Sequence, residues 1–198
     1  MSKSVILCGV GGQGTVLASK LISYAAMEKG DEVKSAETIG MAQRGGSVTS
    51  HVRMGKEAFS PLIPKGKADV MIAFEPAEAV RNLPYLKDDG VVVVSKKEVK
   101  PVTSSLSAKE YDGKEMIDYL KSKISRIVVV DGEKATHELG SSKVLNVVLL
   151  GAAIASNEID ISMDEIRKAI REKVPEKFHE LNNRALDTGA RLYNESLS

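Results

Sequence analysis

The sequence predicts an α/β fold in which a doubly wound, mostly parallel sheet is flanked by helices. Short apolar runs typical of buried parallel strands recur along the chain, and segments with helical spacing of apolar residues separate them. The first run is followed at once by a glycine-rich turn and a helix, which is the order found in Rossmann-like folds. We find no internal repeat and no low-complexity linker, so residues 1–198 are expected to form one domain.

The N-terminal segment carries the most informative motif. The apolar residues Val5–Cys8 predict a buried strand, and apolar residues four apart predict a helix from about Gln13 to Lys29, ended by Gly30. Between them is a G-x-G-x-x-G spacing with one extra glycine, formed by Gly9, Gly11, Gly12, Gln13 and Gly14. Such glycines let the backbone approach a phosphate, and the helix N-terminus offers unpaired N–H groups. Tight strand–helix packing would explain the same glycines equally well.

The remaining elements follow in alternation. Strands are expected at residues 32–37, 47–54, 68–74, 91–94 and 127–130, and residues 57–63 are expected to pair back antiparallel. Helices are expected at 76–83, 115–123, 143–156, 162–173 and from 175 onward. The helix at 143–156 is apolar on nearly all sides, which predicts burial against the sheet and at a subunit interface as well.

A second glycine-rich stretch follows the strand at 32–37. It reads Met-Ala-Gln-Arg-Gly-Gly, and its candidate binding residues are Met41, Gln43, Arg44, Gly45 and Gly46. It lies on the carboxyl side of a strand, where open α/β sheets bind ligands or partners. The Arg44 guanidinium presents a planar fork of donors that suits a carboxylate or a phosphate. A surface turn with a solvated arginine is the alternative.

A conventional NAD(P) enzyme is one interpretation of the first glycine loop. Glu37 follows Gly14 at about the spacing at which an acidic residue binds a ribose hydroxyl, whereas Arg44 would favour a 2′-phosphate. No convincing hydride-transfer constellation accompanies these residues. The chain therefore resembles a nucleotide-type fold without its own catalytic apparatus, and a stand-alone nucleotide-binding or regulatory protein is the alternative function.

Composition limits the partners and cofactors. The 28 basic and 27 acidic residues nearly cancel, which gives no indication of a nucleic-acid or membrane-surface partner. No apolar run reaches the roughly 18 residues of a membrane span, and the first strand leaves no room for a signal peptide, so a cytoplasmic location is expected. Cys8 is the one cysteine, and an iron–sulfur cluster needs about four thiolates. The three histidines show no metal-ligand spacing, so no metal site is expected.

These motifs, in this order, resemble the β subunit of indolepyruvate:ferredoxin oxidoreductase, and more distantly the γ subunit or domain of pyruvate and other 2-oxoacid:ferredoxin oxidoreductases. The resemblance covers nearly the whole chain, and the Met-Ala-Gln-Arg-Gly-Gly form of the second loop points to the arylpyruvate branch. Besides the two loops it rests on Ser50-His-Val-Arg53, Ser60-Pro61, Phe74-Glu-Pro-x-Glu-Ala79-x-Arg81, Asn146 with Leu150-Gly-Ala152, and Asn182-x-x-Ala185-x-x-x-Gly189.

The resemblance implies that this chain is one subunit of an enzyme whose other subunit carries the cofactors. In this family the α subunit holds thiamine diphosphate and 4Fe-4S iron–sulfur clusters. The complex oxidatively decarboxylates an aryl 2-oxo acid with coenzyme A, giving an aryl-acetyl-CoA, carbon dioxide and reduced ferredoxin. The present chain would carry no cofactor and would be active only with its α subunit, and homodimerisation of the isolated chain stays open. The two glycine loops are implied as contacts to a ligand or partner, and no catalytic residue is assigned.

Overall fold

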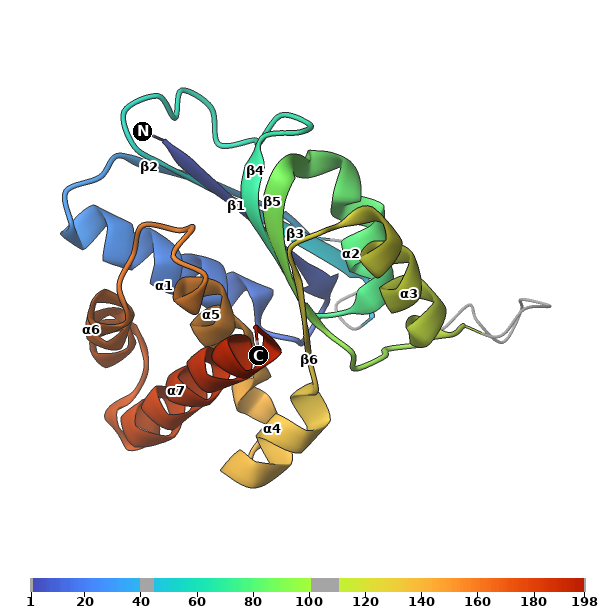
Figure 1. Cartoon of the computed structure of the whole chain (residues 1–198). Coiled ribbons are helices and arrows are strands. Elements are labelled where there is room, and N and C mark those ends of the chain that lie inside the picture. The colour runs from blue at the N-terminus through green and yellow to red at the C-terminus, as the bar shows by residue number, and fades with distance from the viewer. Residues whose placement is uncertain (1, 40–44, 101–110, 198) are drawn as a thin grey trace.

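The computed structural model describes residues 2–39, 45–100 and 111–197 (Figure 1). At its centre is a six-stranded sheet in the order β2-β3-β1-β4-β5-β6. The strands are β1 (Lys3–Val10), β2 (Val33–Ile39), β3 (Ser47–Met54), β4 (Ala68–Ala73), β5 (Leu86–Ser95) and β6 (Ile127–Val130). Strands β1, β4, β5 and β6 pair in parallel, whereas β3 is antiparallel to both β1 and β2. The predicted mostly parallel sheet is therefore confirmed, with an antiparallel strand between β1 and β2.

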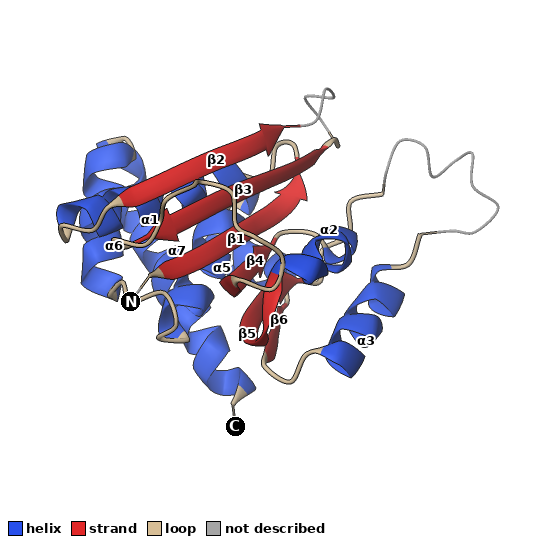
Figure 2. Ribbon diagram, turned by 90° about the horizontal axis from the view of Figure 1, so that it is seen from above, coloured by secondary structure: helices blue, strands red, loops and turns tan. Residues whose placement is uncertain are grey.

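Helices cover both faces of the sheet (Figures 1 and 2). On one face α1 (Thr15–Glu28) and α5 (Leu145–Ala155) pack with α4 (Gly132–Leu139), α6 (Met163–Lys173) and α7 (His179–Ser196). The other face is covered by α2 (Pro76–Asn82) and α3 (Gly113–Lys123). Short 3-10 helices occupy Leu83–Tyr85, Ser142–Val144 and Glu176–Phe178. No helix of the described ranges is long and apolar enough to cross a membrane.

Alternation along β1 explains the two-sided core. Val5 and Leu7 belong to the cluster shared with α1 and α5, while Ile6 and Cys8 belong to the cluster under α2 and α3. Successive side chains of a strand point to opposite faces, so a continuous apolar run requires cover on both sides. This run predicted the buried strand correctly, and Cys8 is fully buried as expected.

The end of α1 and the start of α6 lie at residues that the sequence indicates, whereas α1 begins at Thr15, two residues after the expected start. Gly30 adopts a left-handed conformation with φ of 96°, just past the end of α1. At the start of α6, Ser162 Oγ accepts from the Glu165 N–H at 3.3 Å, and the Ser162 N–H donates to Glu165 Oε2 at 2.7 Å. This reciprocal pair is the predicted capping box.

Helix α5 is buried along its length because α7 crosses it within the same chain. A Cβ placed on Gly189 of α7 would lie 1.9 Å from the Val148 carbonyl oxygen, and one on Gly151 would lie 2.1 Å from the Leu186 carbonyl oxygen. The two helix backbones therefore touch where the glycines lie. The burial that predicted a subunit interface is supplied by α7, so that expectation loses its basis.

Two further expectations differ from the structure. Residues 57–63 form an irregular loop rather than a strand, and Pro61 lacks the N–H that a paired strand needs. Helix α4 is not among the expected helices, because Asp131 and Gly132 at its start resemble the end of a strand. The Asp131 carboxylate caps this helix by accepting from the Lys134 N–H at 3.0 Å, and Gly140 ends it with φ of 73°.

Candidate functional site

The candidate site lies at the carboxyl edge of the sheet, where the chain switches faces between β1 and β4. After β1 the chain enters α1 on one face, and after β4 it enters α2 on the other (Figure 1). Open α/β sheets bind ligands at such a switch point, because the loops that leave the two strands diverge there. The first glycine loop and Glu75 are both at this position.

The first glycine loop is closed by the side chain of Gln13. Its Oε1 accepts from the Val10 N–H at 2.8 Å, and its Nε2 donates to the Phe74 carbonyl oxygen at 3.0 Å. A Cβ on Gly9 would lie 2.7 Å from Gln13 Oε1 and 2.8 Å from Phe74 Cβ. Only glycine therefore fits at position 9 without displacing a neighbour, because Gln13 and Phe74 fill the adjoining space. The two hydrogen bonds of Gln13 also join the end of β1 to the end of β4.

The other glycines of this loop serve its turn and its contact with α5. Gly12 has φ of 97° and is exposed, and no atom lies within 4 Å of a Cβ placed there. Gly14 precedes α1 with φ of 82°, and its carbonyl accepts from Asn146 Nδ2 at 3.4 Å. Asn146 Oδ1 is buried and accepts no hydrogen bond from the described residues. The amide of Asn146 is thus a polar group beside the N-terminus of α1, and the sequence indicated it only through the family resemblance.

The second glycine loop meets the first. Met41, Gln43 and Arg44 lie outside the described residues, but Gly45 and Gly46 are described. The Gly11 N–H donates to the Gly46 carbonyl oxygen at 2.8 Å. The structure therefore brings together two loops that the sequence analysis selected independently, and it does so because antiparallel β3 begins beside the end of β1.

Glu37 is placed away from the first glycine loop. It lies on β2 and accepts from Ser19 Oγ at 3.3 Å, and β3 separates it from β1. Its register partner on β3 is Ser50, whose partner on β1 is Leu7. Glu37 is therefore level with the middle of β1 rather than with the loop. This geometry removes the basis for the ribose contact that its spacing predicted.

Buried carboxylates lie directly after β4, at the start of α2. Glu75 is 2% exposed, and its Oε2 caps α2 by accepting from the Glu78 N–H at 3.1 Å. The Tyr111 hydroxyl also donates to Glu75, which joins the start of α2 to the segment before α3. Burial raises the pKa of the Glu75 carboxyl. Glutamate followed by proline at a strand end was the only sequence signal for this group.

Glu78 extends this polar cluster toward β3. Its Oε2 accepts from Ser47 Oγ at 2.6 Å, and its Oε1 is 3.5 Å from Arg81 Nε. The Cys8 thiol is buried beneath it, and burial together with the charges of Glu78 and Glu75 raises the pKa of Cys8. A thiol with a raised pKa and no exposure is a poor nucleophile, so Cys8 serves the packing of the sheet rather than chemistry.

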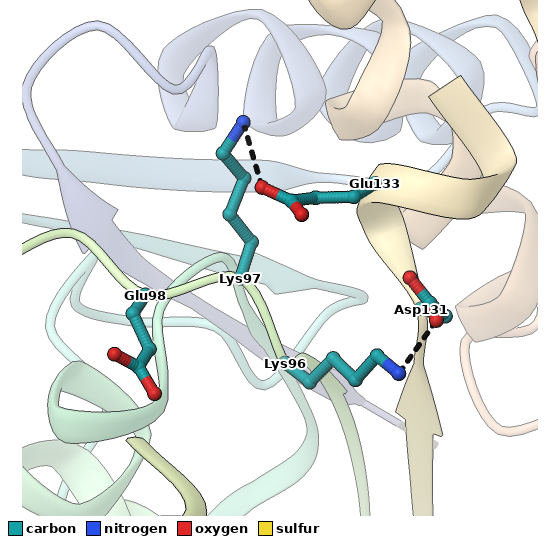
Figure 3. Close-up of a pocket in the computed structure, with 5 residues that line it drawn as sticks. All are labelled: Lys96, Lys97, Glu98, Asp131 and Glu133. Atoms are coloured by element: carbon teal, nitrogen blue, oxygen red, sulfur yellow. Dashed lines mark ion pairs between the residues drawn. The ribbon is translucent and has the colours of Figure 1, made fainter. Parts of the chain in front are cut away.

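An open groove of about 320 Å³ lies where β5 and β6 end (Figure 3). It is lined by Lys96, Lys97, Glu98, Asp131 and Glu133. Lys96 Nζ is 2.5 Å from Asp131 Oδ2, and Lys97 Nζ is 3.8 Å from Glu133 Oε1. The Lys96 ammonium holds the pKa of the Asp131 carboxyl below its usual value. Sequence reasoning missed this groove, because its residues come from a stretch without a clear pattern and from an unexpected helix.

The carboxyl edge thus offers polar and charged groups for binding. Among the described residues no group of three or more His, Cys, Asp or Glu side chains is arranged to hold a metal ion. His51 lies away from this edge, opposite Ile6 in the sheet. It is buried and accepts from the Ile63 N–H at 3.3 Å, and burial lowers the pKa of its imidazole. The arrangement suits the contact of a charged ligand or a partner chain with the two glycine loops.

Comparison with known proteins identifies the family. The family model for pyruvate ferredoxin/flavodoxin oxidoreductase matches residues 4–192. The chain is 39% identical to the indolepyruvate oxidoreductase subunit IorB of Archaeoglobus fulgidus, covering 100% of this chain and 97% of the relative. It is 35% identical to the subunit of that name from Pyrococcus horikoshii, with 98% of each chain covered.

A solved structure agrees with these relatives. The γ subunit of a keto/oxoacid ferredoxin oxidoreductase from Geobacter sulfurreducens superposes with a TM-score of 0.71 at 25% identity, covering 98% of this chain and 99% of the other. Because the superposition covers nearly all of both chains, the mixed sheet and both helical layers are common to the two proteins. The chain therefore belongs to the pyruvate ferredoxin/flavodoxin oxidoreductase family and is a subunit of a heteromeric 2-oxoacid:ferredoxin oxidoreductase.

Proposed function

We propose that residues 1–198 form a single γ-type domain that is the non-cofactor-carrying subunit of an indolepyruvate (arylpyruvate):ferredoxin oxidoreductase. The observation that carries this proposal is the full-length similarity to indolepyruvate oxidoreductase subunits, at 39% identity. The Met-Ala-Gln-Arg-Gly-Gly form of the second loop supports the same branch. The reaction would be oxidative decarboxylation of an aryl 2-oxo acid with coenzyme A, yielding an aryl-acetyl-CoA, carbon dioxide and reduced ferredoxin.

In this proposal the redox cofactors belong to the α subunit. Thiamine diphosphate and the 4Fe-4S clusters would be held there, since a cluster needs about four thiolates and this chain has one buried cysteine. The purified chain alone should then be colourless, contain no stoichiometric iron and fail to turn over an arylpyruvate. Iron bound in stoichiometric amount, or turnover without a partner, would contradict the assignment of the redox cofactors to the α subunit.

The two joined glycine loops are proposed as the contact to the α subunit or to a ligand bound between the subunits. The proposed contact residues are Gly9, Gly11, Gly12, Gln13, Gly14, Glu37, Met41, Gln43, Arg44, Gly45 and Gly46. Within this set Arg44 would carry the charge, through a charge-assisted contact to a phosphate or carboxylate. Glu37 is the weakest member, because β3 separates it from the first loop.

The test is co-expression with the α subunit and an assay of arylpyruvate- and coenzyme A-dependent ferredoxin reduction. Arg44→Ala should cost roughly 2–5 kcal/mol in partner affinity or in kcat/KM. Arg44→Lys should recover only part of the loss, because an ammonium lacks the planar fork. A thermal melt of the free subunit is the control and should not change. Unchanged assembly and turnover in Arg44→Ala would assign this residue to a solvated turn.

The alternative expected from the sequence is a stand-alone nucleotide-binding or regulatory protein, which the membership of this chain in a family of oxidoreductase subunits disfavours. It is favoured by the G-x-G-x-x-G spacing and disfavoured by the position of Glu37 and by the folded-back Gln13. Calorimetric titration of the chain with NAD and NADP separates the two functions. A micromolar dissociation constant, equivalent to about −8 kcal/mol, would support the alternative.

A further inference from the structure

The segment that joins β3 to β4 presents two large apolar side chains to solvent. Phe59 is 86% exposed and Leu62 is 55% exposed. We call residues 59–62 the Phe59–Leu62 knuckle. Isolated exposed apolar residues are common on protein surfaces. Here an aromatic and an aliphatic side chain are both exposed within four residues of one loop, and aromatic side chains are enriched at binding interfaces.

The knuckle is held in place by the rest of the fold. Ala58 and Ile63, its immediate neighbours in the chain, are each 2% exposed and anchor it on both sides. Arg53 Nη1 donates to the Ser60 carbonyl oxygen at 3.0 Å, and the Ile63 N–H donates to His51 Nδ1 at 3.3 Å. The apolar side chains are therefore displayed by an ordered backbone, and binding would cost little conformational entropy.

Positive charge accompanies the knuckle. The segment from Gly55 to Lys67 contains the exposed lysines Lys56, Lys65 and Lys67 and a single acidic residue, Glu57. Among the described residues none of these three ammonium groups takes part in an ion pair. A partner that complements this segment would have an acidic rim around an apolar recess.

The knuckle is remote from the candidate site. Strand β3 is antiparallel to β1, so it ends, and β4 begins, at the amino edge of the parallel strands (Figure 2). The glycine loops and the charged groove lie at the carboxyl edge. The knuckle and the glycine loops therefore cannot be parts of one small-molecule pocket.

We propose that the Phe59–Leu62 knuckle is a second docking surface, which anchors this chain to an acidic, apolar-centred surface of the larger subunit. The proposal rests on the proposed function, because that function supplies the larger subunit. A second copy of this chain is a poorer occupant, since a two-fold contact built on this segment would set lysines against lysines. A transient electron acceptor is also a poorer occupant, since brief redox encounters bury little area, whereas a rigid aromatic anchor is typical of stable interfaces.

The experiment measures the affinity of the purified chain for the separately purified larger subunit from the same organism. Phe59→Ser should weaken binding at least about 30-fold. Tyr119→Ser on α3, which removes another exposed aromatic ring (46% exposed), is the matched control and should change affinity less than about threefold. Both variants should melt like the wild type, because neither ring is buried.

The lysines provide an independent readout. The double change Lys65→Glu with Lys67→Glu should lower the association rate constant about tenfold at low salt. It should also weaken or reverse the salt dependence of association, because the attraction to an acidic surface is lost. An association rate and a salt dependence unchanged by this charge reversal would overturn the electrostatic part of the proposal.

Each other outcome has a definite meaning. If the wild-type chain assembles and Phe59→Ser binds equally well, the docking proposal is wrong and the proposed function stands. If the wild-type chain does not bind the larger subunit at all, both are wrong. If Phe59→Ser assembles normally but has a raised KM for ferredoxin, the knuckle binds the electron acceptor. If Phe59→Ser changes the oligomeric state of the isolated chain, the knuckle binds a second copy of the chain. Either result overturns the occupant proposed here.

Discussion

Replacing Gly189 by alanine tests the crossing of α5 and α7, on which the apolar layer beneath the sheet depends. The new Cβ would lie 1.9 Å from the Val148 carbonyl oxygen and 2.8 Å from the Ala152 nitrogen. Both contacts are to main-chain atoms, so no change of rotamer can relieve them. A non-bonded carbon and oxygen approach to about 3.3 Å, so the two helices would have to separate by at least about 1.4 Å.

Two terms of opposite sign set the size of the effect. Alanine is favoured over glycine in a helix by about 1 kcal/mol, so an unhindered site would gain stability. Overpacking costs about 1–3 kcal/mol, occasionally more, and the upper end applies where backbone meets backbone. The net expectation is a loss of about 2–3 kcal/mol in the free energy of unfolding. For a chain of this size that corresponds to a fall of about 5–10 °C in Tm.

The assay is urea unfolding followed by circular dichroism, with a thermal melt beside it. Gly151→Ala should lose a similar amount, because its Cβ would lie 2.1 Å from the Leu186 carbonyl oxygen. The double variant should lose less than the sum, since helices separated by one methyl group accommodate the second. Gly30→Ala, where no atom lies within 4 Å, reports backbone strain alone and should cost about 1 kcal/mol. A Gly189→Ala protein as stable as the wild type would refute the reasoning.

Three further changes test other parts of the fold. Ser162→Ala removes half of the capping box with Glu165 and should cost about 1 kcal/mol of unfolding free energy, which urea unfolding would measure. Gly9→Ala forces a methyl group against Gln13 Oε1 and should cost about 1–3 kcal/mol; a melt unchanged from wild type would show that the loop yields freely. Burial raises the pKa of Glu75 above its ordinary value of 4.5, so its contribution to stability is complete below that pH and is lost as the pH rises through the folded-state pKa. Glu75→Gln should therefore gain stability relative to the wild type as the pH increases, and parallel pH–stability curves would contradict this assignment.

The sequence predicted the elements whose signals are local. The apolar run before Gly9, the glycine turn and the helical spacing after Gly14 are contiguous, so strand, loop and helix could be assigned together. The same holds for the capping box at Ser162, where two side chains three residues apart define a helix start. Helix α4 was missed because its few apolar residues, chiefly Ala135 and Leu139, are too sparse to show a periodicity.

What the sequence could not predict depends on pairing between distant segments. The alternation of residues 47–54 indicated a strand, but no local signal placed it antiparallel between β1 and β2. That placement joins Gly11 to Gly46 and separates Glu37 from the first loop. Tyr111 likewise reaches Glu75 from a segment that has no regular pattern. The composition of the candidate site therefore follows from sheet order, which short-range periodicity does not encode.

Gln13 decides how the first glycine loop can be used. In the structure its carboxamide already holds the Val10 N–H and the Phe74 carbonyl, at 2.8 and 3.0 Å. A phosphate that bound the Val10 N–H would have to displace this side chain and leave a main-chain carbonyl without its donor, at a cost of about 1–3 kcal/mol. Gly12 lies on the exposed side of the loop, and a methyl group placed on it would have no neighbour within 4 Å. A partner or its ligand can therefore approach at Gly12, next to the second loop, without breaking any of these hydrogen bonds.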